Sequence, residues 1–289
     1  MSREAGQLIV AAFNEKKHIA IKTNQLDIVT ETDKQAEAHI IRAIQQLYPT
    51  HAFIGEESHD TPGQYHITDS PTWVIDPIDG TNNFVHSLPF VCVAIGVLVR
   101  REMAVAVIHA PILGETFTAI RGRGAYLTNH PVYPPLPASL ATLPPAPTAD
   151  SHRLSTSAIT ALNAAAVITE LGYDRSAAGM HTALERLRLL CCGHSMQSLR
   201  SYGSCALNMC YVAVGRAEAY YEGRDAMIGP KPWDSGAAAL IVRESGGCVY
   251  DTNGGTYDMC SGRVLACNNE EMARLLIDVF QQVKAYVEQ

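Results

Sequence analysis

The sequence lacks a concentrated run of basic residues. Among its 289 residues, 22 are Lys or Arg and 29 are Asp or Glu, which gives a formal net charge of -7. No basic block is available to neutralise the phosphates of a nucleic-acid backbone, so we expect no nucleic-acid partner. For such an acidic chain to bind an anionic ligand, its local field must be inverted, and bound cations do this most directly.

Long hydrophobic segments are also missing. The apolar stretch at residues 8–13 is too short to cross a membrane, and no signal-peptide cleavage pattern follows it. The eight cysteines include no Cys-x-x-Cys pair, and most lie within apolar runs, which is typical of buried, reduced thiols. We therefore expect a cytoplasmic protein with no membrane association.

Two other signatures are absent. The glycine-rich residues 122–124 lack the Lys-Ser/Thr ending of a nucleotide-binding P-loop and indicate a turn instead. None of the eleven histidines stands in an Arg-His-Gly or His-x-Glu arrangement, and we interpret His86 as a loop or surface residue. The sequence therefore argues against a phosphohistidine mechanism.

Apolar periodicity predicts an α/β fold, with an α+β first half and a layered α/β second half from about residue 155. Helices are predicted at residues 2–20, 32–48, 178–190, 204–214, 235–245 and from about 270. Strands are predicted at residues 73–76, 90–99, 103–109, 217–221, 247–251 and 263–267, with a further apolar element at 164–168. The first pair of long strands implies antiparallel pairing.

A proline-rich segment separates the two halves. Residues 131–147 contain seven prolines, which predict a stiff, exposed connector or surface loop. We expect residues 1–289 to form a single catalytic unit of two lobes, roughly 1–150 and 151–289.

Residues 73–84 carry the most informative pattern, an apolar strand followed by closely spaced acids. The strand delivers Asp76 to its carboxyl edge, and Pro77 is expected to stop the ladder there. Asp79 follows after a tight turn, so both carboxylates can face one point.

The rest of this loop supplies further polar backbone groups. The carbonyl of Ile78 lacks a predicted strand partner and can serve as an oxygen ligand. The amides of Gly80 and Thr81 open a short helix and form a concavity of the kind that holds a phosphate. Residues 78–81 alone would favour a plain Asp-Gly turn, but the whole pattern favours a combined metal and anion site.

Three more acids fit the same site. Glu56 and Glu57 follow a short apolar strand, where exposed charges would also be unremarkable. Asp234 precedes an apolar helix, where its alternative role is an N-cap. In the company of Asp76 and Asp79, these acids predict a hard divalent cation site, because oxygen-only donors suit magnesium, calcium or manganese.

These motifs carry a family resemblance. Residues 55–58, 73–81 and 233–236 together closely resemble the inositol monophosphatase family, and the likeness continues through Lys22 and residues 27–33, 219–222 and 244–247. The resemblance implies a lithium-sensitive, magnesium-dependent phosphatase, usually a cytoplasmic homodimer, with a five-layered αβαβα sandwich fold.

The resemblance also implies a metal-binding role for six residues. A first Mg²⁺ would be held by Glu56, Asp76 and the Ile78 carbonyl, and a second by Asp76, Asp79 and Asp234. A third, weaker ion would involve Glu56 and Glu57 through water. Mn²⁺ is a possible substitute.

Catalytic and substrate roles follow from the same resemblance. The catalytic set would be Thr81, Asp33, Glu56 and Asp79, in which Thr81 and Asp33 orient the attacking water. The substrate set would be Gly80, Thr81, Glu222, Asp234, Cys205 and Tyr173, in which the first two hold phosphate through their amides and the next two contact the inositol hydroxyls.

The departures from the family pattern concern the substrate. Tyr173 stands where a small residue is typical, and Cys205 stands where Ala is usual; both positions lie near the sugar. The segment at residues 223–232 is longer than is usual in the family, and the proline-rich connector has no recognised counterpart there. We predict hydrolysis of a small phosphorylated polyol, myo-inositol 1-phosphate. The alternatives are the same chemistry on fructose 1,6-bisphosphate, adenosine 3',5'-bisphosphate or histidinol phosphate, or a non-catalytic metal-binding regulatory protein.

Overall fold

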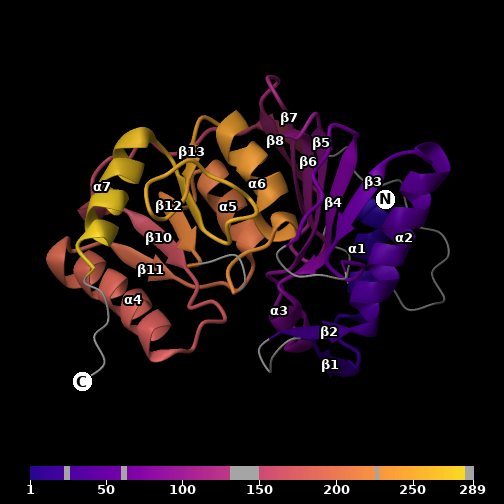
Figure 1. The fold of residues 1–289 in the computed structure, drawn as a ribbon, viewed down its shortest axis with the longest axis horizontal. Coiled ribbons are helices and arrows are strands. Elements are labelled where there is room, and N and C mark those ends of the chain that lie inside the picture. Colours follow the sequence, from indigo (N-terminus) through magenta and orange to yellow (C-terminus); the bar gives the residue numbers. More distant parts are fainter. Residues whose placement is uncertain (23–26, 60–63, 131–149, 225–227, 284–289) are drawn as a thin grey trace.

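The computed structural model describes the chain except for residues 23–26, 60–63, 131–149, 225–227 and 284–289. The predicted proline-rich connector lies outside the described residues. Two large sheets alternate with three layers of helices, and Figure 1 shows the five layers side by side. This arrangement confirms the predicted αβαβα sandwich.

A seven-stranded sheet, with the strand order β3-β4-β5-β6-β7-β8-β9, forms the core of the first half. Its strands are β3 (Ala52–Gly55), β4 (Thr72–Asp79), β5 (Cys92–Val99), β6 (Glu102–Ala110), β7 (Glu115–Ile120), β8 (Ala125–Asn129) and β9 (Asp150–Arg153). Only the β3–β4 pair is parallel, and the predicted antiparallel hairpin joins β5 to β6. Its two turn residues, Arg100 and Arg101, have φ angles of 52° and 65°, the positive values that a tight hairpin turn requires.

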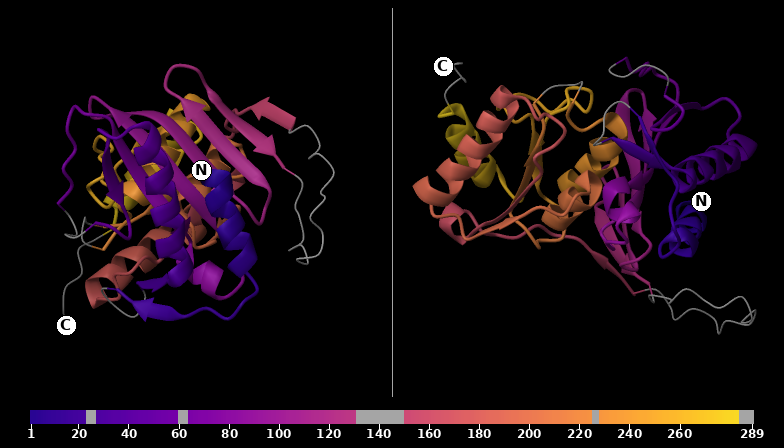
Figure 2. Two further views of the ribbon diagram at one scale, coloured as in Figure 1. Left: turned by 90° about the vertical axis from the view of Figure 1, so that its right-hand side faces the viewer. Right: turned by 90° about the horizontal axis from the view of Figure 1, so that it is seen from below.

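Helices α1 (Ser2–Ala12) and α2 (Glu31–Leu47) cover the outer face of this sheet, and Figure 2 shows them crossing it. Their apolar sides pack with β4 and β5 in one cluster that includes Ile9, Ile40 and Ile75. The prediction of a first helix through residue 20 is wrong. Residues 19–21 instead form β1 (Ile19–Ile21), which pairs with β2 (Ile28–Thr30), because apolar periodicity alone does not separate a short strand from a helix end.

Helices α5 (Cys205–Ala213) and α6 (Pro232–Glu244) form the middle layer. The largest core cluster includes residues of both helices and of both large sheets, such as Phe117 and Tyr220. Almost every residue of these two helices is buried, as expected for helices between two sheets. The shorter α3 (Thr81–Val85) follows β4.

A five-stranded sheet, with the strand order β11-β10-β12-β14-β13, forms the core of the second half. Its strands are β10 (Ala166–Thr169), β11 (Ser198–Arg200), β12 (Ala219–Glu222), β13 (Cys248–Tyr250) and β14 (Val264–Cys267), and a 3-10 turn, η1 (Leu162–Ala164), precedes β10. Helices α4 (Ala177–Arg188) and α7 (Glu270–Gln281) form the outer layer, and a π-helical turn, η2 (Leu189–Gly193), extends α4. The predicted elements of this half are confirmed within a few residues.

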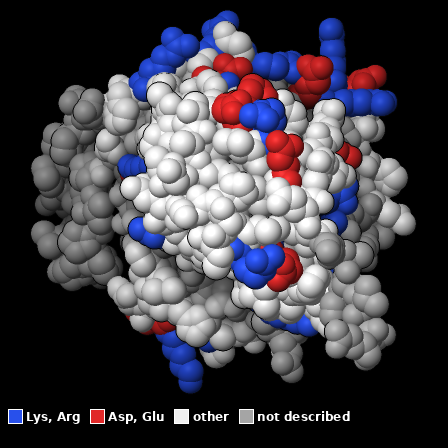
Figure 3. Space-filling model, turned by 90° about the vertical axis from the view of Figure 1, so that its left-hand side faces the viewer, with Lys and Arg blue, Asp and Glu red and all other residues white. Residues whose placement is uncertain are grey.

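On the face that carries α4 and α7, charged side chains gather at the margins and leave a broad uncharged area (Figure 3).

The structure also tests the predictions for the cysteines and for His86. Five cysteines are buried as expected, but Cys191 and Cys192 are exposed in η2, which corrects the prediction for that pair. His86 is exposed at the end of α3, as predicted. No helix in the described part of the chain is long and apolar enough to span a bilayer.

Candidate active site

A β-bulge in β4 brings the two aspartates of the central motif together. Strand β4 pairs with β5 up to Asp76, opposite Ala94; the register then shifts, and pairing resumes at Asp79, opposite Cys92. The prediction that Pro77 ends the ladder is therefore wrong, because the bulge carries the proline, which cannot donate a ladder hydrogen bond, and the strand continues beyond it.

Carboxylates from distant parts of the chain converge at this bulge. Oxygen atoms of Asp76, Asp79 and Asp234 all lie within 4.8 Å of one another. Burial and the neighbouring acids, above all Glu56, raise the pKa of Asp76 well above its usual range. Three acids this close repel one another unless cations are present, and an all-oxygen donor set suits a hard divalent ion.

Asp79 is held by the start of α5. Its Oδ2 accepts hydrogen bonds from the Ser204 hydroxyl at 2.5 Å and the Ala206 amide at 2.7 Å, and its Oδ1 accepts one from the Cys205 amide at 3.3 Å. Burial raises the pKa of Asp79 to about 6 even though these donors oppose the rise. The amino end of α5 thus fixes this carboxylate from the other half of the chain.

Asp234 lies in the first turn of α6. The helix begins at Pro232 with Lys231 as its N-cap, so the alternative role of Asp234 as the N-cap is wrong. Instead, its Oδ2 accepts a hydrogen bond from the Lys231 amide at 2.6 Å. Burial, with Asp79 nearby, raises the pKa of Asp234 to about 7.

Glu56 and Glu57 share one cation, Lys22. The Lys22 Nζ lies 2.7 Å from an oxygen of Glu56 and 2.6 Å from an oxygen of Glu57. Burial and the charge of Glu56 raise the pKa of Glu57 to about 7. The amide of Glu57 donates to a carboxylate oxygen of Glu37 at 2.8 Å, which fixes the backbone of this turn.

Thr81 and Asp33 form a hydrogen-bonded pair beside the three aspartates. The Thr81 hydroxyl lies 3.2 Å from Asp33 Oδ1 and 3.0 Å from the Ile78 carbonyl oxygen. The other oxygen of Asp33 accepts from the amide and hydroxyl of Thr30, a capping box at the start of α2. Asp33 is completely buried, and burial raises its pKa to about 6.

These groups open onto one cleft, whose volume is about 330 Å³. Its lining includes Glu56, Asp76, Ile78, Asp79, Gly80, Thr81, Tyr173, Cys205, Glu222 and Asp234. Asp33 and Glu57 do not line the cleft. Asp33 is hydrogen-bonded to the lining residue Thr81, and Glu57 shares Lys22 with the lining residue Glu56. The structure therefore gathers the sequence-predicted set at one place.

The far end of the cleft is shaped by the second half. The Tyr220 hydroxyl donates to a Glu222 carboxylate oxygen, and burial raises the pKa of Glu222 to about 8. Cys205 is 8% exposed in the wall, whereas Tyr173 is 47% exposed at the rim. Burial thus favours the protonated form of Glu222, which can both donate and accept hydrogen bonds.

Sequence reasoning did not identify several supporting residues. These are Glu37, Ser204 and Tyr220, which contact Glu57, Asp79 and Glu222 respectively. Lys22 was noted only as part of the resemblance, not as the partner of the two glutamates. Ser204 was predictable as an N-cap, because a serine before an apolar helix commonly has that role. The local sequence did not indicate which carboxylate its hydroxyl binds.

The fold and site together define a metal-dependent phosphomonoester hydrolase. A profile of the inositol monophosphatase family matches residues 1–285. Inositol monophosphatase 1 of Solanum lycopersicum is 39% identical over 268 residues, covering 92% of this chain and 87% of the relative. Inositol monophosphatase 1 of Homo sapiens is 35% identical over 283 residues, covering 98% and 92%.

A solved structure, an IMPase of Thermotoga maritima, matches with a TM-score of 0.78 at 27% identity, covering 98% of this chain and 94% of that one. The chain belongs to the inositol monophosphatase family.

Proposed function

We propose that this protein hydrolyses myo-inositol 1-phosphate to inositol and phosphate. The observation that carries the proposal is the meeting of Asp76, Asp79 and Asp234 within 4.8 Å, beside the Thr81–Asp33 pair. The names of the relatives support inositol phosphate as the substrate. Phosphate monoesters hydrolyse so slowly that a catalyst has to supply on the order of 20 kcal/mol, more than side-chain acids and bases provide alone.

The proposed cofactor is Mg²⁺, as two or three ions, with Mn²⁺ as a substitute. Glu56, Asp76 and the Ile78 carbonyl would hold one ion, and Asp76, Asp79 and Asp234 another. Such ions would supply the positive charge that stabilises the phosphate and the leaving alkoxide, and would acidify water beside the phosphorus. A third ion at Glu56 and Glu57 would have to share these carboxylates with Lys22.

The chain's own groups would position the reactants. The Thr81 hydroxyl, by donating to Asp33, leaves its lone pairs free to accept a hydrogen bond from the attacking water and so orient it. The amides of Gly80 and Thr81, at the start of α3, would hold the phosphate oxygens. The carboxyl group of Glu222, and that of Asp234 beside the proposed ions, would contact the polyol hydroxyls.

Cys205 and Tyr173 are the proposed specificity residues. Cys205 narrows the wall next to Glu222, and Tyr173 stands at the rim of the same cleft. Because the site draws on both halves, we further propose that lobes 1–150 and 151–289 work as a single catalytic unit. The family resemblance supports a cytoplasmic, lithium-sensitive homodimer.

A substrate panel tests this proposal. We expect kcat/KM with Mg²⁺ to be highest for inositol 1-phosphate among a set that includes fructose 1,6-bisphosphate, adenosine 3',5'-bisphosphate and histidinol phosphate. A Cys205→Ala variant is expected to change the ratios within the panel by up to about tenfold, because one side-chain atom in a pocket discriminates only modestly. If another ester ranks far above inositol 1-phosphate, the substrate is wrong. If metal binds but no ester is cleaved, the enzymatic function is wrong.

A further inference from the structure

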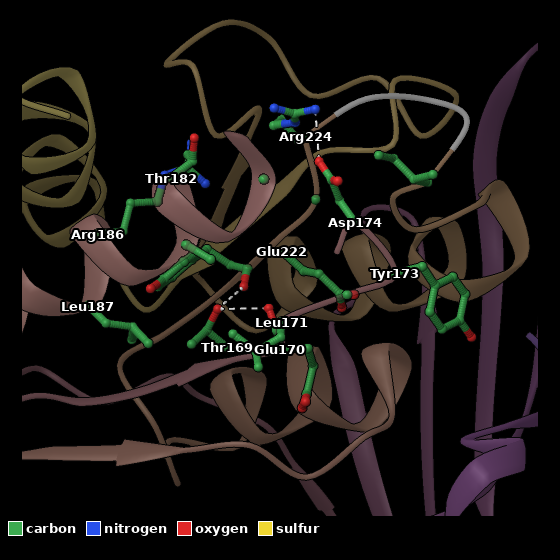
Figure 4. Close-up of a pocket in the computed structure, with 16 residues that line it drawn as sticks. Thr169, Glu170, Leu171, Tyr173, Asp174, Thr182, Arg186, Leu187, Glu222 and Arg224 are labelled. Atoms are coloured by element: carbon green, nitrogen blue, oxygen red, sulfur yellow. Dashed lines mark hydrogen bonds and ion pairs between the residues drawn. The ribbon is translucent and has the colours of Figure 1, made fainter. Parts of the chain in front are cut away.

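A second cavity, which we name the α4 pocket, lies between helix α4 and the carboxyl ends of β10 and β12. Its volume is about 50 Å³. Figure 4 shows Arg186 and Thr182 of α4 on one side of it and the Asp174–Arg224 ion pair on the other. Residues 170–173 and Glu222 line both this pocket and the catalytic cleft, so this loop forms the wall between the two.

The topology of the five-stranded sheet favours a ligand at this position. Strands β10 and β12 are parallel neighbours, so their carboxyl ends meet at the same edge. The chain leaves β10 for α4 in the outer layer and leaves β12 for α6 in the middle layer, so the two connections depart on opposite faces. In open α/β sheets, ligands bind in the crevice that such a divergence creates.

Two buried donors in the α4 pocket lack acceptors. Tyr221 is 3% exposed, and its hydroxyl has no hydrogen-bond partner in the described part of the chain. The Nε of Arg186 is likewise buried and without one. The Arg186 guanidinium carbon lies 4.5 Å from the centre of the Phe280 ring, and stacking of this kind fixes the group without satisfying its N–H donors.

The neighbouring carboxylates are already engaged. Glu170 points away from the pocket in Figure 4 and accepts hydrogen bonds from the amides of Tyr202 and Gly203, both at 2.8 Å. Asp174 is paired with Arg224 at 2.8 Å. Among the ion pairs of the described residues, none includes Arg186. Its positive charge therefore remains available to a ligand, although the residue is only partly buried.

We propose that the α4 pocket is an anion subsite that takes one phosphate-sized oxyanion, held by the Arg186 guanidinium and the Tyr221 hydroxyl. An oxyanion offers acceptors to both donors and a negative charge to the arginine. Two sources share this chemistry. One is free inorganic phosphate, and the other is the second phosphate of a doubly phosphorylated substrate that extends from the catalytic cleft past the loop at residues 170–173. This subsite goes beyond the proposed function.

The first experiment titrates inorganic phosphate into the full-length, metal-free protein in EDTA and follows binding by calorimetry. We expect saturable binding that weakens at least about tenfold in Arg186→Gln and about three- to tenfold in Tyr221→Phe. Arg188→Gln is the matched control, since Arg188 lies on the same helix, more than half exposed, and pairs with Glu185; it should bind as the wild type does. Because no turnover is measured, the result is independent of the proposed function.

Hydrogen exchange locates the bound phosphate. Protection of residues 177–188 supports the subsite, whereas protection confined to residues 79–85 places the phosphate in the catalytic cleft and overturns it. Unsaturable binding by the wild type, or equal binding by Arg186→Gln, overturns it as well. If Arg186→Gln does not fold, Arg186→Lys keeps the charge but loses the planar fork, and an intermediate affinity is expected.

Kinetics distinguish the two sources. If a second substrate phosphate occupies the subsite, Arg186→Gln lowers kcat/KM for inositol 1,4-bisphosphate about tenfold and leaves inositol 1-phosphate unchanged. If free phosphate is the occupant, both substrates are turned over as by the wild type while phosphate binding in EDTA is lost. An equal loss on both substrates contradicts the proposal, because Arg186 would then serve the catalytic cleft or the fold itself.

Discussion

Replacement of Asp79 by Asn should make the metal-free protein more stable at pH 8 while lowering its activity. The rise in the pKa of Asp79 from 3.8 to about 6 means that its ionised form costs the folded state roughly 3 kcal/mol. Asn removes that charge, but its NH₂ group cannot accept the hydrogen bond that one of the two oxygens now accepts, which costs about 1 kcal/mol. At pH 8, the metal-free variant should therefore be more stable by about 2 kcal/mol.

The pH dependence fixes the sign of this effect. A carboxyl whose pKa is higher in the folded state binds its proton more tightly there, so the wild type loses stability as the pH rises from about 4 through 6. Below pH 4, the wild type and the variant are both neutral at position 79, so they differ only by the hydrogen bond that the variant has lost. Asp79→Asn should therefore be slightly less stable than the wild type there. The two stability curves should cross between these limits.

The assay is thermal unfolding in EDTA at pH 4 and pH 8, followed by circular dichroism. At pH 8, the midpoint of Asp79→Asn should lie roughly 4–8 °C above that of the wild type, while its kcat/KM with Mg²⁺ should fall at least about a thousandfold because a charged ligand is missing. Asp278→Asn, an exposed position on α7, is the control and should change neither quantity appreciably. A variant that is no more stable than the wild type at pH 8 would refute the reasoning.

Two other substitutions test the groups around the carboxylates. Lys22→Met removes the cation shared by Glu56 and Glu57 and should lower the free energy of unfolding of the metal-free protein by roughly 3 kcal/mol or more, an effect that Mg²⁺ should partly reverse. The control, Lys16→Met at an exposed position, should leave the stability unchanged. An unchanged melting midpoint of Lys22→Met in EDTA would rule out this role for Lys22. Thr81→Ala should lower kcat about a hundredfold or more with KM little changed, while Thr81→Ser should stay within about tenfold, as measured by steady-state kinetics at saturating Mg²⁺. Equal rates for Ala and Ser would show that the hydroxyl is not needed.

The fold was largely predictable because its helices and strands have strong local patterns. The regular apolar spacing of residues 32–48 predicted α2 almost to the residue, and α7 and β14 were found equally well. The errors fall where tertiary contacts decide. Residues 19 and 20 were predicted as the end of the first helix, but residues 19–21 form a strand because they pair with residues 28–30.

The metal-ligand candidates were predictable for a different reason. Asp76 and Asp79 stand in a motif of unusual composition, and the structure does bring Asp234 to them. The supporting contacts were not predictable from local sequence, because they join residues far apart in the chain. Ser204 binds Asp79 across 125 positions, and Lys22 reaches Glu56 across 34. No local pattern encodes such a pairing.

The anchoring of Asp79 by the start of α5 has a consequence for the newly made protein. During synthesis, the bulge in β4 leaves the ribosome more than a hundred residues before the Ser204 hydroxyl and the Ala206 amide that hold its carboxylate. At ~5–20 residues per second, that interval lasts several seconds, during which the motif exists without its final geometry. A growing chain of this enzyme is therefore catalytically silent until its second half has emerged and docked.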